Sequence, residues 1–277
     1  MTERTQDQTL RIEAFAQQYL PGAVRLSQQA GWPHRAADWA FTAAVSKGFV
    51  GIENGEVVAT AFCSEFGDFC TINMIIVDAA MRGRGLGRRM MDRVIAAAQG
   101  RGMSLVATAD GLPLYEKLGF RATGEVVQHQ GIVTEVPALP EGFATPRIAT
   151  RDDLPVIAAM DRAACGADRF AMLSNLFDIA TIRICDTGFA SVRDFGRGRT
   201  VGPVVARDAM TARGLIAASA ATGGFLRLDT RPDCGLSDFL TAMGLSPVGG
   251  GITMHCGPAR PAAKEFMTYA LTSQALG

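Results

Sequence analysis

The chain has 277 residues, and 48% of them are hydrophobic, which suits one large or two ordinary domains. Its 27 basic and 27 acidic side chains balance to a formal net charge of zero. This balance argues against nucleic acid and against a membrane surface as partner, because such binding proteins usually carry a basic excess. No apolar run approaches the ~18 residues of a membrane span, and residues 1–10 lack the apolar core of a signal peptide, so we expect a cytoplasmic protein.

The first half of the chain predicts a mixed α/β domain. A weakly alternating edge strand comes first, and two helices follow that are separated by Gly31-Trp32-Pro33. Asn54-Gly55 then joins two strands and is a strong hairpin signal. The predicted strands are 10–15, 49–53, 57–64, 71–77, 104–108 and one that begins at Phe120, and the predicted helices are 21–30, 35–47, 86–98 and 112–118.

A glycine- and arginine-rich segment, Val77-Asp78-Ala79-Ala80-Met81-Arg82-Gly83-Arg84-Gly85-Leu86-Gly87-Arg88, lies between a strand and a helix. Three glycines at alternate positions let successive backbone N–H groups converge on one point. The following helix directs the positive end of its dipole there, and three arginines add cations. The segment therefore suits a pyrophosphate. The glycines are Gly83, Gly85 and Gly87, and the arginines are Arg82, Arg84 and Arg88.

Other glycine-rich motifs fit this segment less well. The dinucleotide fingerprint needs G-x-G-x-x-G and an acidic residue about twenty positions later, and neither is present. The phosphate loop of nucleotide hydrolases ends in G-K-[ST], which is also missing. RNA-binding Arg-Gly tracts are longer and disordered. An ordinary glycine-rich turn before a helix remains the alternative.

Two ordered motifs resemble those of the GCN5-related N-acetyltransferase (GNAT) family. Arg82-Gly83-Arg84-Gly85-Leu86-Gly87 matches the family's acyl-CoA signature [RQ]-x-x-G-x-[GA], and Leu114-Tyr115-Glu116-Lys117-Leu118-Gly119-Phe120 is similar to its Y-x-x-x-G-F segment. The resemblance implies an α+β mixed sheet, in an acyl-CoA N-acyltransferase-like fold. It also implies acetyl-CoA (coenzyme A) as the acyl donor.

The resemblance also implies roles for individual residues. Tyr115 would protonate the departing thiolate, although a tyrosine that only packs on the cofactor is the alternative. Thr108 and Asp110 would line the pantetheine arm, or would serve as a cap and a turn. The general base stays open, since the strand 71–77 contains no carboxylate. The implied cofactor-binding residues are Ile75, Ile76, Val77, Arg82, Gly83, Arg84, Gly85, Leu86, Gly87, Arg88, Thr108 and Asp110. Residues that could act as a base, and that equally suit capping or solvated roles, are His34, Asp38, Glu65 and Asp68.

The second half of the sequence resembles a degenerate repeat of the first half, which predicts an internal duplication. The copy has lost the phosphate-binding residues, because Thr211, Ala212 and Ile216 stand where Arg82, Gly83 and Gly87 would be. We therefore expect an acetyl-CoA-binding GNAT catalytic domain over 1–137, a linker over 138–146 and a degenerate GNAT-like domain over 147–277. The matching segments are Arg11-Ile12 with Arg147-Ile148, Leu20-Pro21 with Leu154-Pro155, Ala80–Leu86 with Ala209–Leu215, and Leu118-Gly119-Phe120 with Met243-Gly244-Leu245.

These features together predict an N-acetyltransferase. It would transfer acetyl from acetyl-CoA to a primary amine of a small molecule by direct attack in a ternary complex. A non-catalytic acyl-CoA sensor or assembly module is one alternative. An acyltransferase with a longer acyl donor or a hydroxyl acceptor is another. The identity of the acceptor, a homodimer and a ligand for the second domain stay open. The segment that shapes acceptor specificity in the family corresponds here to Trp32, His34, Asp38 and Trp39.

The six cysteines and three histidines predict no metal site. The cysteines are scattered without a C-x-x-C pair, and the histidines lie far apart in the sequence. We expect reduced, mostly buried thiols, neither disulfide-bonded nor bound to metal.

Overall fold

A computed structural model of the chain describes residues 10–138, 145–261 and 265–277. The chain divides into two compact units. Unit 1 is formed by the chain up to Ser64 together with Ile72–Gln99, and unit 2 by Glu65–Thr71 together with Gly100–Gly277.

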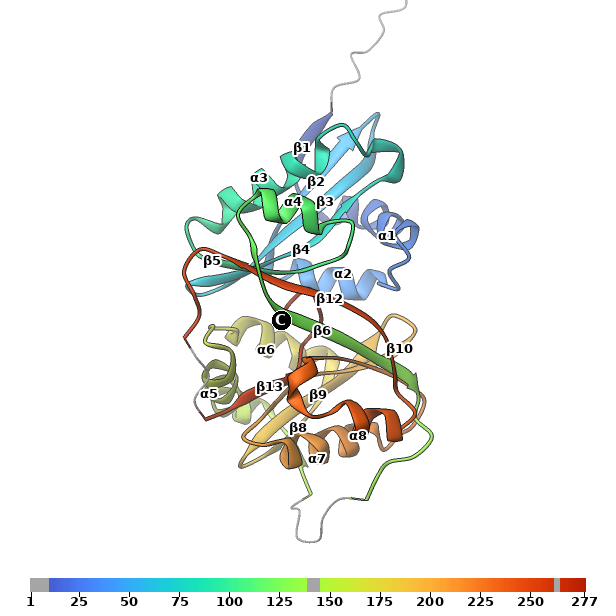
Figure 1. Cartoon of the computed structure of the whole chain (residues 1–277), viewed down its shortest axis with the longest axis vertical. Helices are drawn as coiled ribbons and strands as arrows, with labels where there is room; N and C mark the ends of the chain where they lie inside the picture. The colour runs from blue at the N-terminus through green and yellow to red at the C-terminus, as the bar shows by residue number, and fades with distance from the viewer. Residues whose placement is uncertain (1–9, 139–144, 262–264) are drawn as a thin grey trace, which may run out of the picture. The chain divides into compact units, whose positions relative to one another are not determined.

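Unit 1 is built on strands in the order β1-β2-β3-β4. The β2–β3 hairpin turns at Asn54 and Gly55, which both have positive φ, as the Asn-Gly signal predicts. In Figure 1, α3 lies on one side of these strands, and α1 and α2 lie on the other. The elements are β1 (Arg11–Ala14), η1 (Gln17–Tyr19), α1 (Leu20–Gln29), α2 (Ala36–Ala43), β2 (Ser46–Glu53), β3 (Glu56–Phe66), β4 (Phe69–Val77), η2 (Ala79–Met81) and α3 (Leu86–Ala98).

An aromatic cluster forms the core of unit 1 under α2. Trp39 is fully buried and meets the ring of Phe62 edge-on, with 5.6 Å between centroids. Phe15 contacts the same phenylalanine at 5.0 Å. The helix predicted over 35–47 was too long, because Ser46 already pairs with Ser64 of β3 and donates its hydroxyl to the Thr42 carbonyl oxygen. Sheet pairing therefore outweighs helix propensity at this end.

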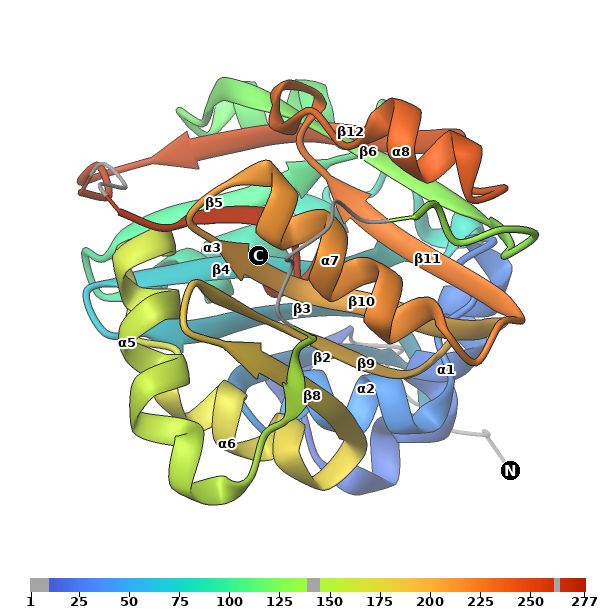
Figure 2. The same ribbon diagram turned by 90° about the horizontal axis from the view of Figure 1, so that it is seen from below.

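Unit 2 contains strands in the order β5-β12-β6-β11-β13-β10-β9-β8-β7, and the start of β4 pairs in parallel with β5. Figure 2 shows α7 packed across β9 and β10. The elements are β5 (Gly102–Ala107), α4 (Leu112–Lys117), β6 (Arg121–Ile132), β7 (Arg147–Ile148), η3 (Arg151–Asp153), α5 (Leu154–Cys165), α6 (Phe170–Ile179), β8 (Ala180–Cys185), β9 (Gly188–Phe195), β10 (Gly198–Ala206), α7 (Ala209–Ala220), β11 (Phe225–Thr230), η4 (Pro232–Cys234), α8 (Ser237–Ala242), β12 (Ser246–Cys256) and β13 (Met267–Ala270).

The long strands β6 and β12 are exchanged between the two halves of the sequence. β6 follows β5 and α4 in the chain, yet it pairs antiparallel with β11, from Val127↔Thr230 to Ile132↔Phe225. β12 belongs to the second half, yet it pairs antiparallel with β5, from Ile252↔Ala107 to Cys256↔Met103. The two strands also pair with each other. Within unit 2, the exchange joins β5 and β6 of the first half to β11 and β12 of the second half by hydrogen bonds.

The duplication predicted from the sequence appears in the fold. Leu-Pro opens α1 at Leu20 and opens α5 at Leu154, and both helices follow a short strand and a 3-10 turn. The ends of α4 and α8 also match, since Gly119 and Gly244 have φ of 86° and 90°. Most of the predicted linker, residues 139–144, lies outside the described part of the chain.

Candidate functional site

The glycine-rich segment forms an open turn in front of α3. Gly83 and Gly85 have φ of 77° and 73°, and a Cβ built on either would meet nothing within 4 Å. Backbone conformation, and not crowding, therefore requires glycine here. Gly85 is the N-cap of α3 and supplies no side-chain hydrogen bond to it. The first N–H groups of the helix consequently have no side-chain cap, which is the arrangement that binds anions.

The arginines of this segment are exposed, and Arg84 and Arg88 form ion pairs. Arg84 forms a forked ion pair with Glu53, with Nη2–Oε1 at 2.7 Å and Nη1–Oε2 at 3.2 Å. This hydrogen-bonded carboxylate raises the pKa of Arg84. Arg88 pairs with Asp92 one turn later at 2.9 Å. Both guanidinium groups are more than half exposed, which keeps the energies of these pairs small, so the arginines stay able to exchange partners. Leu86, by contrast, is 1% exposed and anchors the helix in the core.

The strand before the segment carries a local distortion at Met74. Its φ is 49°, which costs a residue with a Cβ roughly 1–3 kcal/mol. The buried Thr60 hydroxyl donates to the Met74 carbonyl oxygen at 2.7 Å and holds this conformation. Ile75, Ile76 and Val77 follow the distortion and lead into the turn. The parallel ladder with β5 runs over Phe69–Thr71 and ends before them. No sequence signal marks Met74 as strained.

Tyr115 lies in unit 2, on α4. Its side chain is buried, and its ring meets Phe120 edge-on at 6.2 Å. Burial raises the pKa of Tyr115 to about 12. The phenol therefore keeps its proton throughout the physiological range.

Thr108 and Asp110 form the turn that leads into α4. The Thr108 carbonyl oxygen accepts hydrogen bonds from the N–H groups of Gly111 and Leu112, each at 3.1 Å. Both Thr108 and Asp110 are exposed. This geometry is that of a cap and a turn, and it leaves their side chains accessible.

The segment expected to shape the acceptor site is occupied by packing and capping contacts. The Trp39 indole donates to Ser27 Oγ at 3.1 Å inside the core. Asp38 accepts from the Arg35 backbone N–H at 2.9 Å and pairs with the Arg35 guanidinium at 3.0 Å. The rings of Trp32 and His34 contact each other at a tilt of 47°, with 5.7 Å between centroids. Asp38 therefore acts as a helix cap in this structure.

The second half has lost the anion-binding turn. The residues aligned with it, Ala209–Leu215, are all helical and belong to α7. They form a helix because they lack the alternating glycines. The Asp208 side chain caps this helix and accepts from the Thr211 N–H at 2.7 Å. A carboxylate thus occupies the position at which a phosphate would bind.

Comparisons with known proteins agree with these features. The model of the acetyltransferase (GNAT) family matches residues 12–120, and that of an acetyltransferase (GNAT) domain matches residues 157–270. The chain carries two GNAT domains in tandem. It is therefore a GNAT acyltransferase, of a family that generally uses acetyl-CoA.

Relatives extend over nearly the whole length of this tandem GNAT chain. The uncharacterized N-acetyltransferase YitH of Bacillus subtilis (strain 168) is 29% identical over 94% of this chain and 96% of its own. A solved structure from Pyrococcus horikoshii has a TM-score of 0.84 at 17% identity, covering 100% of this chain and 99% of its own. The tandem GNAT protein from the clavulanic acid biosynthesis pathway has a TM-score of 0.64 at 13% identity, covering 91% and 100%. These structural likenesses support the fold.

Two further properties concern the described residues only. None of their helices is long and apolar enough to cross a bilayer. They also contain no group of three or more His, Cys, Asp or Glu side chains arranged to hold a metal ion.

Proposed function

We propose that this GNAT chain transfers acetyl from acetyl-CoA to a primary amine of a small molecule by direct attack in a ternary complex. The donor supplies an activated thioester when it is bound. The first domain would bind it, and the second domain would not bind acyl-CoA in the usual way. The uncapped N-terminus of α3 behind Gly83 and Gly85 is the observation that supports this proposal most directly.

The residues of the turn fit a pyrophosphate. The backbone N–H groups from Gly83 to Arg88 would donate to its oxygens, and the α3 dipole would favour its charge. The exposed guanidinium groups of Arg82, Arg84 and Arg88 would add charge-assisted contacts. Arg84 and Arg88 would then share or exchange their carboxylate partners.

Tyr115 would supply the proton that the departing thiolate needs. A phenol with a pKa of about 12 is protonated at neutral pH and can act as an acid. The acceptor amine must be neutral to attack, and an alkylamine has a pKa near 10. The strand 71–77 contains no carboxylate, so the amine would lose its proton to water or arrive uncharged. Ile75, Ile76 and Val77, with Thr108 and Asp110, would line the donor's arm.

The test is release of free thiol from acetyl-CoA by the full chain against a panel of primary amines. Tyr115→Phe is compared with Tyr269→Phe, which removes the hydroxyl of another buried tyrosine, on β13. We expect amine-dependent release that falls about a hundredfold in Tyr115→Phe and stays near wild type in Tyr269→Phe.

Two outcomes would contradict parts of the proposal. Tight acetyl-CoA binding with no release for any amine would favour a non-catalytic acyl-CoA module. Equal rates in the two tyrosine variants would remove Tyr115 from the chemistry and leave the transfer itself standing.

A further inference from the structure

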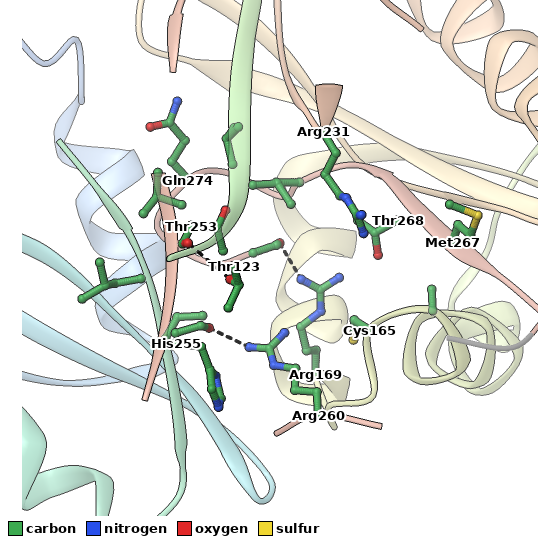
Figure 3. A pocket seen from close by; sticks show the side chains of 18 of the residues that line it. Thr123, Cys165, Arg169, Arg231, Thr253, His255, Arg260, Met267, Thr268 and Gln274 are labelled. Atoms are coloured by element: carbon green, nitrogen blue, oxygen red, sulfur yellow. Dashed lines mark hydrogen bonds between the residues drawn. The ribbon is translucent and has the colours of Figure 1, made fainter. Parts of the chain in front are cut away.

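Unit 2 contains a cavity of about 440 Å³ whose charged side chains, among the described residues, are all basic. Arg169, Arg231, Arg260 and His255 contribute to its wall, and no aspartate or glutamate among the described residues does. Figure 3 shows the arginine side chains entering from three separate segments. The cavity shares no residue with the turn in front of α3. Its volume is that of a small-molecule site.

Arg260 is a half-buried cation without a carboxylate partner among the described residues. It donates to Ser104 Oγ at 2.9 Å, and its guanidinium carbon lies 5.6 Å from the ring centroid of Phe69. Burial lowers its pKa, because neither a hydroxyl nor an aromatic face replaces the lost hydration of a full charge. A buried guanidinium usually has an anionic partner.

The other two arginines of the wall are already neutralised. Arg169 holds Asp161 in a buried fork, with Nε–Oδ2 at 2.8 Å and Nη2–Oδ1 at 2.5 Å. Arg231 pairs with Asp233 at 2.7 Å where both side chains are more than half exposed. Arg169 also donates through Nη1 to oxygens of Leu276 and Gly277, so its hydrogen-bonding capacity is used within the protein. Arg260 is therefore the arginine of this wall that lacks a carboxylate partner among the described residues, and it can accept one negative charge.

The remaining lining suits a short organic body. Leu105, Val106 and Val126 give one wall an apolar surface. Thr268 borders the same cavity, and its Oγ1 is buried without a hydrogen-bond partner. Such orphaned groups are uncommon in native structures and are usually satisfied by water or by a ligand.

We propose that this cavity binds a small organic monocarboxylate, with its carboxylate on Arg260 and its apolar part against β5 and β6. The planar guanidinium fork matches a carboxylate in two hydrogen bonds. One unneutralised cation favours a monoanion over a phosphate dianion. The inference concerns binding alone and does not depend on the proposed acetyl transfer.

Calorimetric titration of the full chain tests this inference. The probes are butyrate, hexanoate and phenylacetate, their primary amides, and inorganic phosphate. We expect at least one carboxylate to bind with 1:1 stoichiometry and its amide to give no measurable heat. Arg260→Gln should weaken that carboxylate by roughly tenfold to a hundredfold, because it removes a charge-assisted contact.

Matched variants keep the result interpretable. Arg162→Gln removes an exposed arginine on α5 and should bind like wild type. Circular dichroism shows whether Arg260→Gln folds. If it does not fold, Arg260→Lys and Thr268→Val are used in its place, and each should bind the carboxylate severalfold more weakly than wild type. The proposal is overturned if no carboxylate binds more tightly than its amide, if phosphate binds in preference to every carboxylate, or if the Arg260 and Thr268 variants bind as well as wild type.

Discussion

Gly111 and Tyr115 pack against each other at the start of α4, and only a glycine permits this contact. A Cβ built on Gly111 would lie 2.7 Å from Cε2 of the tyrosine ring and 3.1 Å from its hydroxyl oxygen. The ring is buried and meets Phe120, so it has little freedom to retreat. The position of the phenol is therefore set by the residue four positions earlier.

Gly111→Ala should displace the Tyr115 ring and lower acetyl transfer by about tenfold to a hundredfold, because a misplaced catalytic group loses most of its effect. The measurement is amine-dependent thiol release. Gly124→Ala is the control, since a Cβ there meets nothing within 4 Å. An unchanged rate in Gly111→Ala would argue that the phenol takes no part in the reaction.

The pKa of Tyr115 gives a prediction for alkaline pH. The folded-state pKa of about 12 lies above the ordinary value near 10. Folding therefore favours the neutral phenol. This contribution to stability is complete below about pH 10 and is lost as the pH rises toward 12. Wild type should lose stability relative to Tyr115→Phe over that interval, measured as the difference in melting temperature. Titration of tyrosinate absorbance in both proteins checks the pKa directly, and an ordinary value for this residue would remove the effect.

The turn in front of α3 allows a matched comparison of two glycines. Gly85 and Gly55 have φ of 73° and 83°, and a Cβ on either meets nothing within 4 Å. Alanine should cost about 1 kcal/mol of unfolding free energy at each position, from left-handed backbone alone. Only Gly85→Ala should also weaken acetyl-CoA binding, by severalfold, because it changes the direction of the N–H groups proposed to bind the pyrophosphate. Equal affinity in the two variants would argue against this turn as the binding site.

The sequence predicted the strand, turn and helix around Gly83–Arg88 because local chemistry determines them. Alternating glycines before an amphipathic run specify both the turn and the start of α3. The Asn54-Gly55 hairpin and the left-handed Gly119 are local in the same sense. The bounds of the turn and of α3 could therefore be expected without coordinates, while the roles proposed for their residues rest on the family resemblance.

Features that depend on distant segments could not be predicted in this way. The ion pair of Arg84 with Glu53 joins residues 31 positions apart. The cavity around Arg260 is assembled from segments that are far apart in the sequence. The exchange of β6 and β12 also could not be predicted from the sequence. The alternation of side chains along each strand would suit pairing with a strand of its own half equally well.

Two glycines of β12 allow a test of the close contact between β12 and β6. Gly249 and Gly250 are neighbours with the same φ of 157°, but their surroundings differ. A Cβ on Gly250 would lie 1.8 Å from the carbonyl oxygen of Val126 on β6, whereas one on Gly249 meets nothing within 4 Å. Gly250→Ala must push β12 away from β6 and should lower the unfolding free energy by about 2 kcal/mol or more. Gly249→Ala shares the backbone cost that this φ imposes on a residue with a Cβ, roughly 1 kcal/mol, but not the clash, so it should be the less destabilising of the two. Urea unfolding of both variants measures the difference, and equal stabilities would show that β12 does not lie against β6 in solution.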